Sequence, residues 1–583
     1  MSWWGPELLP DGVRLRLWAP DAETVAVEVD GGDGAALEQA GDGWWQTVLP
    51  IGAGARYRFR VGELTVPDPA SRAQAGGVHG WSVVVPRLCS REGGSPGLAE
   101  QADVVGGGSG SPPSRGHGAW TGRPWHEMVI LEVHAGLCGG FAGIAERLPE
   151  IAATGITAIE LMPIGAFGGT RGWGYDGVLH YAVHEDYGTP AELRALVDAA
   201  HGHGVSVFLD VVYNHFGPDG NYLGAYAADF FDADTQTPWG GAVAVGREPV
   251  ARFFIDNALM WLRDYGVDGL RFDAVHAIGN AAFLDRLAAE VRAALPGRHV
   301  HLVLENESND AARLRPGAFD AQWNDDFHNV MHVLLTGETH AYYADFAERP
   351  AERLARCLAE GFIYQGEGSP NHDGHPRGSP SGHLPPTAFV AFLQNHDQVG
   401  NRALGERLTV LADPAKLRAA TALLLLCPQV PLLFMGEPEG SETPFLFFTD
   451  FHDDLADAVR EGRRREFAKF PAFADAAARE TIPDPNARAT FERSRPAPGD
   501  TAWPALYREL LALRRERIAP HLPGARAIGA EATGAAAVTA RWRLGDGATL
   551  TIAIDLGDTP APLPTPATPL FVAGDRLVAW IAP

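Results

Sequence analysis

The sequence predicts an α/β protein, with a parallel sheet linked by helices and a smaller β-domain at each end. Between residues 128 and 434, short apolar strands alternate with amphipathic helices. Strands joined through helices run parallel, and eight such units fit a TIM (β/α)8 barrel with insertions, with an open doubly wound sheet as the alternative. Before residue 87 and after about residue 525, strands of period two recur between Gly, Asp and Pro turns, which predicts β-domains there.

The elements follow in order along the chain. Residues 1–90, with strands at 13–18 and 24–29, predict an immunoglobulin-like, carbohydrate-binding-like β-sandwich, and the Gly/Ser-rich residues 91–120 predict a flexible linker. The barrel is expected over 121–522, with strands at 128–134, 157–163, 205–211, 269–273, 301–305, 319–323, 388–393 and 430–434 and helices at 144–154, 191–203 and 257–263. Residues 523–583, with strands at 538–543 and 550–554, predict a C-terminal β-sandwich.

Composition limits the partners of the chain. A net charge of −26 over 583 residues repels a phosphate backbone or an anionic bilayer, so nucleic acid and membrane are excluded as expected partners. The four cysteines lie far apart without metal-binding spacing, which favours reduced thiols over a disulfide framework. No signal peptide or membrane span is visible in the sequence. A cytoplasmic protein is expected.

Charged residues interrupt the ends of several predicted strands. Strand 205–211 carries Asp210, strand 269–273 carries Arg271 and Asp273, and strand 301–305 ends in Glu305. Any one of them has a structural explanation as a cap or turn residue. Because strand ends meet at the C-terminal face of a TIM barrel, their recurrence, together with Asp397 after the seventh strand, predicts an active site there.

Paired carboxyl groups indicate glycoside hydrolysis. Arg271 is expected to keep Asp273 ionised as a nucleophile, while partial burial among other acids keeps Glu305 protonated as the acid. Asp397 is expected to hold sugar hydroxyls and distort the ring. A retaining reaction requires the carboxyl groups of Asp273 and Glu305 to lie about 5–5.5 Å apart. Zinc-binding spacings are absent near these strand ends, and the pair His201 and His203 is expected at the surface.

Four stretches at these positions resemble the ordered motifs of the α-amylase superfamily: Asp210-Val-Val-Tyr-Asn-His215, Gly269-Leu-Arg-Phe-Asp273, the strand-ending Glu305 and Asn395-His-Asp397. The resemblance implies Asp273 as nucleophile, Glu305 as acid/base and Asp397 as transition-state stabiliser. It also implies that Arg271, His215 and His396 contact the nucleophile or the sugar in the −1 subsite, and that Tyr175 stacks under that sugar.

Longer stretches resemble the maltooligosyltrehalose trehalohydrolase family within that superfamily. They include Phe319-Asp-Ala-Gln-Trp-Asn-Asp-Asp-Phe-His328, Leu335-Thr-Gly-Glu338, Gly361-Phe-Ile-Tyr-Gln-Gly366 and the run from Gln394 to Arg407. This resemblance implies hydrolysis of the α-1,4 bond next to the terminal trehalose of a maltooligosyltrehalose, functional coupling to a maltooligosyltrehalose synthase, and no metal or organic cofactor. It implies no oligomeric state.

The segment from Trp323 to Asn329 is expected to form the trehalose-side subsites. Asp325, Asp326 and His328 would bind hydroxyl groups, and Trp323 or Phe327 would stack on a sugar ring, although packing of the strand end is an equal alternative for Trp323. The full set of expected substrate-binding residues is Tyr175, Asp210, His215, Arg271, His276, Trp323, Asp325, Asp326, Phe327, His328, Asn329, His396, Gln398 and Asn401.

Besides the Gly-rich segment at about 88–118, which matches the family poorly, two stretches depart from the family pattern. A short loop at Gly136–Gly140 follows the first strand, and Gly436–Ser441 lacks the usual tryptophan after the eighth, so altered subsites are expected. A glycogen branching or debranching enzyme is the enzymatic alternative. A non-catalytic glucan-binding protein is the other, and it would be expected to lose one of the three catalytic carboxyl residues.

Overall fold

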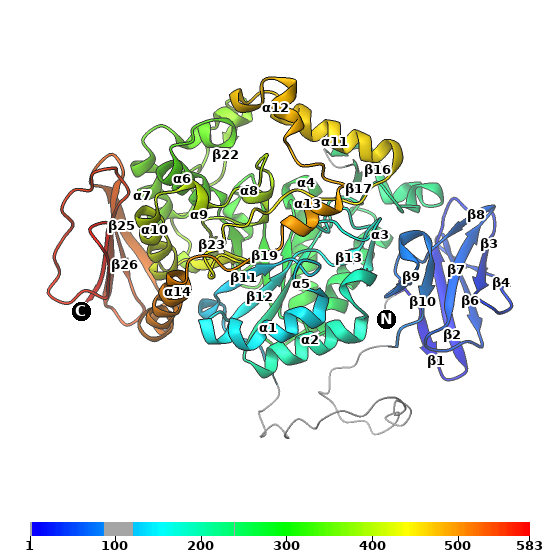
Figure 1. Ribbon diagram of the computed structural model, residues 1–583. Coiled ribbons are helices and arrows are strands. Elements are labelled where there is room, and N and C mark those ends of the chain that lie inside the picture. Colours follow the sequence, from blue (N-terminus) through cyan, green and yellow to red (C-terminus); the bar gives the residue numbers. More distant parts are fainter. Residues whose placement is uncertain (1–2, 87–119, 238–239) are drawn as a thin grey trace.

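The protein has three parts arranged in a row, with the barrel between two β-domains (Figure 1). The structure, a computed structural model, describes residues 3–86, 120–237 and 240–583. The N-terminal β-domain lies at one end of the molecule and the C-terminal β-domain at the other. The linker predicted over residues 91–120 lies outside the described residues except for its last residue.

The N-terminal domain is a sandwich of two antiparallel sheets. One has the order β1-β2-β6-β5, and the other has the order β4-β3-β7-β10-β9 with β8 paired to β7. The strands are β1 Glu7–Leu9, β2 Gly12–Trp18, β3 Val25–Val29, β4 Ala35–Ala36, β5 Glu38–Gly41, β6 Trp44–Leu49, β7 Arg56–Val61, β8 Leu64–Val66, β9 Gln74–Ala75 and β10 Trp81–Val83. Alternate residues of β2 and β3 are buried in one apolar cluster, as their period of two predicts.

The central sheet closes into an eight-stranded parallel barrel, which confirms the predicted fold class. Its strands are β11 Ile130–Val133, β12 Ala158–Leu161, β15 Ser206–Val211, β18 Gly269–Phe272, β19 His301–Leu304, β20 Ala321–Trp323, β23 Phe389–Ala391 and β24 Val430–Phe434. Each of these strands falls within a range that the sequence predicted.

Most strands are joined through helices that form the outer layer of the barrel (Figure 1). The helices between barrel strands are α1 Gly140–Thr154, α2 Pro190–Gly202, α3 Glu248–Leu259, α4 Val275–Ile278, α5 Ala281–Ala294, α6 Asp325–Thr336, α7 Pro350–Glu360, α8 His396–Gly400, α9 Leu408–Leu411 and α10 Pro414–Leu426. After the last barrel strand come α11 Asp453–Phe467, α12 Ala476–Glu480, α13 Arg488–Arg493 and α14 Ala502–Leu513. Between β19 and β20 the chain forms only the 3-10 turn Ala311–Arg313, so the strict alternation predicted from sequence fails at this crossover.

The barrel interior changes from apolar to charged toward its C-terminal face. A buried apolar cluster fills the lower part and includes Ile130, Ala158, Phe208, Val303, Val390 and Leu432. Two residues further along their strands come Glu132, Glu160 and Asp210, which are also buried. A Cβ atom on Gly269 would lie 1.6 Å from the Phe208 ring, so glycine is required where β18 passes this ring.

The C-terminal domain is one five-stranded antiparallel sheet of order β25-β26-β27-β29-β28. Its strands are β25 Arg526–Ala532, β26 Ala537–Arg543, β27 Thr549–Asp555, β28 Phe571–Ala573 and β29 Leu577–Ala582. Helix α7 packs on this sheet, and the Trp542 indole N–H donates to the carbonyl of Leu358 in that helix (3.2 Å). A β-domain at this end is confirmed, but a helix supplies the second layer where the sequence predicted a second sheet.

Among the described residues, no helix combines the length and apolar character needed to cross a bilayer.

Candidate active site

Arg271 connects the charged groups at the C-terminal face of the barrel. Its Nη1 donates to both carboxylate oxygens of Asp210 (2.8 Å each) and to Oδ1 of Asp273 (2.9 Å). Its Nη2 lies 3.3 Å from Oε2 of Glu305. The arginine side chain is only 1% exposed, so the guanidinium and these carboxylates compensate one another away from bulk water. Asp273 and Glu305 thus meet on one cation. The sequence predicted that both converge at this face and that Arg271 compensates Asp273, but not the contact of Arg271 with Glu305.

Glu305 is held by the turn that follows β18. The backbone N–H of Ala274 donates to Oε2 of Glu305 (2.5 Å), and Ala274 has a φ of 39°, a left-handed conformation that is strained for a residue with a Cβ atom. Burial, together with the nearby negative charges of Asp273 and Asp325, raises the pKa of Glu305 to about 8 although Arg271 opposes the shift. Glu305 therefore carries a proton at neutral pH.

Aromatic and histidine side chains line the site beside Asp210. The Tyr175 hydroxyl donates to Oδ2 of Asp210 (2.5 Å), and its ring stacks on His396 with centroids 4.9 Å apart. His215 hydrogen-bonds the carbonyl of Tyr175 through Nε2 (3.0 Å). These contacts fix the Tyr175 ring next to the guanidinium–carboxylate cluster.

His396 is paired with a glutamate that the sequence analysis did not single out. Its Nδ1 lies 2.5 Å from Oε1 of Glu132, and its backbone N–H donates to Oε2 of the same residue (2.9 Å). Burial favours the neutral ring, but the Glu132 carboxylate outweighs it and raises the pKa of His396 to about 9. A protonated His396 therefore faces Asp397, whose Oδ1 lies 3.7 Å from Nε2.

Asp397 is the most accessible of the three predicted catalytic carboxyl residues, with 46% of its side chain exposed. It sits in the first turn of α8, where the Asn395 side chain accepts from its backbone N–H (2.9 Å). The Asn401 amide donates to its Oδ1 (3.0 Å). The exposed carboxylate points to a role at the open mouth of the site.

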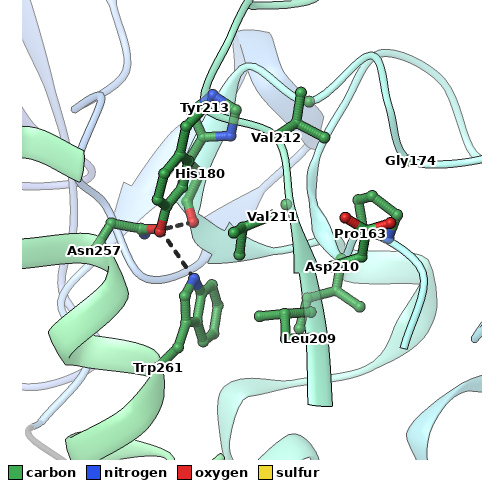
Figure 2. Close-up of a pocket in the computed structure, with 13 residues that line it drawn as sticks. Pro163, Gly174, His180, Leu209, Asp210, Val211, Val212, Tyr213, Asn257 and Trp261 are labelled. Atoms are coloured by element: carbon green, nitrogen blue, oxygen red, sulfur yellow. Dashed lines mark hydrogen bonds between the residues drawn. The ribbon is translucent and has the colours of Figure 1, made fainter. Parts of the chain in front are cut away.

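A small cavity lies behind Asp210, between β15 and α3 (Figure 2). At about 20 Å³ it is too small for a sugar ring and has the size of one water molecule. Asn257 accepts there from the Tyr213 hydroxyl (2.6 Å) and the Trp261 indole N–H (3.1 Å), and it donates to the carbonyl of His180 (2.8 Å). This network anchors the end of β15 from outside the barrel and is not a substrate pocket.

Four residues expected to bind the trehalose end are buried away from the mouth. Asp326 accepts from the backbone N–H groups of Ile363 (2.7 Å) and Tyr364 (3.2 Å), and Phe327 belongs to the apolar core. His328 hydrogen-bonds the carbonyl of Leu393 (2.6 Å).

Trp323 lies inside the barrel under Arg271, with its ring centroid 4.1 Å from the guanidinium carbon. The four side chains are at most 1% exposed, so they do not face the mouth of the site. Trp323, at the end of β20, fits the alternative of packing at the strand end, and the predicted sugar contacts of Asp326, Phe327 and His328 are corrected, because α6 turns these side chains toward the core directly after Asp325.

The remaining predicted residues are partly accessible near the mouth. The Gln398 amide donates to Oδ1 of Asp325 (3.4 Å), and burial raises the pKa of Asp325 to about 7. His276 lies beside Glu307, with 3.7 Å between Nε2 and a carboxylate oxygen. Asn329 is half-buried on α6. Their contacts with a sugar stay predictions.

Sequence reasoning missed three residues around the site. Glu132 and Glu160 interrupt apolar strands just as Arg271 does, so the same signal could have found them. Tyr342, in the 3-10 segment Ala341–Phe346, is 68% exposed, and its hydroxyl lies within electrostatic range of Glu466, Asp397 and Glu307. No local pattern distinguishes this tyrosine from its half-buried neighbour Tyr343.

The two stretches that depart from the family pattern form tight turns. Gly140 has a φ of 75°, and a Cβ atom there would lie 2.6 Å from the carbonyl oxygen of Tyr187. Gly436 has a φ of 82°, and the buried Glu437 accepts from the Tyr507 hydroxyl (2.9 Å). Altered subsites at these turns stay a prediction. Among the described residues, no group of three or more His, Cys, Asp or Glu side chains suits a metal ion.

Comparisons with known proteins agree with this arrangement. The family model for the α-amylase catalytic domain matches residues 106–234, and a model for a domain of unknown function, DUF3459, matches residues 525–579. A crystal structure of a Salmonella typhimurium protein described as an alpha amylase superposes with a TM-score of 0.89 at 41% identity, covering 100% of both chains. A pullulanase from Anoxybacillus sp. LM18-11, at a TM-score of 0.66, 17% identity and coverage of 99% of this chain and 87% of that one, shares the fold.

The barrel and its carboxylate site therefore define a glycosidase of the α-amylase superfamily. Curated relatives narrow the class further. Malto-oligosyltrehalose trehalohydrolase from Deinococcus radiodurans is 41% identical over 87% of this chain and 81% of its own length, and the one from Saccharolobus solfataricus is 36% identical over 88% and 87%. The chain belongs to the malto-oligosyltrehalose trehalohydrolase family.

Proposed function

We propose that the protein hydrolyses the α-1,4-glucosidic bond next to the terminal trehalose of malto-oligosyltrehalose, with retention of configuration, and releases trehalose and a maltooligosaccharide. The observation that supports it most is the shared contact of Arg271 with Asp273 and Glu305, in a chain 34–41% identical to several trehalohydrolases over most of its length. Two carboxyl groups that contact the same guanidinium lie close together, and a retaining enzyme requires a short distance between its two catalytic carboxyl groups.

In the first step, the Asp273 carboxylate attacks the anomeric carbon of the sugar in the −1 subsite. Glu305 gives its proton to the glycosidic oxygen as the C–O bond breaks, so trehalose leaves and a glycosyl ester forms on Asp273. In the second step, Glu305 takes a proton from a water molecule that attacks the same carbon. This restores the Asp273 carboxylate and the Glu305 acid, and no external reactant beyond water is needed.

The charges around the site support these roles. Arg271 donates a hydrogen bond to the attacking carboxylate of Asp273, and burial among acids raises the pKa of Glu305, which must donate a proton. His396, protonated by its contact with Glu132, and the exposed Asp397 are placed to bind sugar hydroxyl groups as positive charge develops on the ring.

The leaving trehalose lies on the side of Glu305, since this residue protonates the leaving oxygen. Tyr342 and Glu307 are both exposed and lie within electrostatic range of each other, so we expect them, in place of the buried Trp323, Phe327 and His328, to form the wall of the trehalose subsites. We infer that the enzyme works in the cytoplasm after a synthase that makes the trehalosyl end.

A glycogen branching enzyme is the second candidate. GlgB from Bordetella pertussis is 34% identical, but the match covers only 45% of this chain and 37% of that protein. Partial coverage of this kind supports the shared superfamily more than a shared activity.

Product analysis tests the proposal. Maltopentaosyltrehalose and maltoheptaose are supplied in parallel to the wild-type enzyme and to D273A. Trehalose and maltopentaose from the first substrate, with little cleavage of the second and an inactive variant, are expected. Preferred cleavage of maltoheptaose, or new branch points in a linear glucan, would contradict the trehalohydrolase assignment. Neither result would affect the barrel fold or the arrangement of its carboxyl groups.

A further inference from the structure

Trp323 lies directly beneath the guanidinium of Arg271. The Arg271 guanidinium carbon is 4.1 Å from the centroid of the Trp323 ring, and both side chains are 1% exposed. The indole N–H has no hydrogen-bond partner among the described residues. The ring thus lies beneath its charged neighbour and is shielded from solvent.

The guanidinium has hydrogen bonds along one edge only. Nη1 donates to Asp210 and Asp273, and Nη2 faces Glu305 at 3.3 Å, whereas Nε has no partner within the described chain. Bonds at one edge leave the group free to tilt about that edge. The aromatic face beneath it restricts this motion, because a planar cation gains most when it stacks parallel to the ring.

Neighbouring rings hold Trp323 itself in place. Its centroid lies 5.5 Å from Phe392 in an edge-on arrangement and 6.2 Å from His396. Strand β20 ends at Trp323, and the apolar layer of the barrel interior surrounds the ring. The platform under Arg271 is therefore rigid.

We propose that Trp323 is a positioning residue that acts through Arg271: its indole face fixes the plane of the guanidinium on which Asp273 and Glu305 meet. The inference rests on the proposed roles of these two carboxyl groups, but not on the trehalose specificity. It assigns to Trp323 a function other than the sugar stacking expected from sequence.

The pH profile of kcat/KM in a Trp323 variant distinguishes a positioning role of Trp323 from a merely structural one. Arg271 lowers the pKa of Glu305, so a guanidinium that tilts away raises the pKa of that carboxyl group. The alkaline limb of the profile of kcat/KM, which Glu305 sets, then moves to higher pH. Loss of core packing alone lowers the melting temperature and leaves the limbs of the folded enzyme in place.

The experiment compares W323L, which removes the π face, with W323F, which keeps a smaller one. Maltotriosyltrehalose and α-maltosyl fluoride serve as substrates at temperatures below the melting transition. The fluoride requires the nucleophile but no trehalose subsite, so a wrong trehalohydrolase assignment affects only the first substrate. W542L, which removes a buried tryptophan from the C-terminal sheet, is the matched control for lost packing.

For W323L we expect the alkaline limb to rise by about half a pH unit and kcat to fall on the order of 10²-fold with either substrate. W323F is expected to lie between W323L and wild type, and W542L to lose thermal stability with unmoved limbs. W323M replaces W323L if the latter does not fold, because methionine fills the space without a π face. Unmoved limbs in W323L or W323M would overturn the proposal.

Discussion

Strand β18 is preceded by Asp268 and followed by Asp273, so one strand brings an aspartate to each face of the barrel. Asp268 is fully buried at the N-terminal face. It accepts hydrogen bonds from the Trp120 indole (2.8 Å), from His201 Nε2 (2.8 Å) and from the backbone N–H of Val207 (2.9 Å). Arg298 adds a positive charge at 3.4 Å. His201, which was expected at the surface, is half-buried here by its contact with Asp268.

At the other end of β18, several carboxyl groups share few donors. Asp210, Asp273 and Glu305 all meet Arg271, and Glu160 lies nearby with neither carboxyl oxygen hydrogen-bonded within the described residues. As a result, the pKa of Asp268 and the pKa of Glu305 are shifted in opposite directions. Burial alone would raise the pKa of Asp268, but its donors hold it below the ordinary value, whereas Glu305 is raised to about 8.

The difference shows how one strand serves two purposes. The Asp268 carboxylate, which accepts several hydrogen bonds, stabilises the N-terminal face, where the residues that stabilise a TIM barrel are found. The crowded carboxyl groups at the C-terminal face remain able to exchange protons. Substitutions at the two ends of β18 are therefore expected to separate stability from activity.

The largest effect is expected for D273N. Loss of the nucleophile lowers kcat/KM on the order of 10⁴-fold or more, because no other group forms the glycosyl ester. The melting temperature is expected to stay the same or rise, since one negative charge leaves a crowded site. Steady-state kinetics and thermal unfolding measure both quantities. A large drop in the melting temperature of D273N would contradict the expected separation of stability and activity between the two ends of β18.

D268N is expected to show the opposite behaviour. Removing the charge leaves His201 and Arg298 without their buried partner and costs about 3 kcal/mol of unfolding free energy, while kcat of the folded enzyme changes little. The folded-state pKa of Asp268 is lowered, so its stabilisation is complete at neutral pH and fades as pH falls through that pKa. Urea unfolding at several pH values measures this. A constant difference between wild type and D268N at all pH values would contradict the role of the charge.

D325N is expected to shift the alkaline limb of the activity profile. Glu305 donates a proton only while protonated, so activity falls as pH rises through about 8. The Asp325 charge contributes to that raised pKa, and its removal moves the limb down by about half a pH unit. D326N is the matched control, because Arg377 already compensates the neighbouring carboxylate at 3.1 Å. An alkaline limb that shifts equally in both variants would contradict the assignment.

E160Q is expected to have the smallest effect. Burial and the charges of Asp210 and Glu132 raise the pKa of Glu160 well above its usual value, so the folded protein keeps a proton that the unfolded chain releases above about pH 4.5. Wild type therefore loses stability as pH rises, and E160Q is expected to gain stability relative to it, with activity little changed. Melting temperatures between pH 5 and 9 measure the difference. Equal pH dependence in the two proteins would show that Glu160 is not held neutral.

Much of this arrangement follows from the sequence, because strand periodicity and chain order determine which residues reach the C-terminal face. Asp210, Arg271, Asp273 and Glu305 were predicted to converge for that reason, and they do. The trehalose-side residues were not predictable in the same way. Trp323 and the start of α6 lie at the right strand end, but side-chain direction there depends on how the helix packs.

The exposure of Tyr342 was also not predictable from the sequence. This tyrosine reaches the mouth from an inserted segment, and its exposure results from contacts that fix its neighbours, such as the stacking of Tyr343 on His332 at 4.0 Å. Such contacts join residues through tertiary packing, which no local pattern in the sequence encodes.

The central claim is that Asp273 attacks the anomeric carbon on the face opposite the leaving trehalose, so that two displacements restore the original configuration. Proton NMR of maltotriosyltrehalose during early hydrolysis identifies the first anomer of the new reducing end. The α anomer, followed by slow mutarotation, is the predicted result. Initial release of the β anomer would contradict the account, because it requires a single displacement by water and leaves no role for Asp273 as nucleophile.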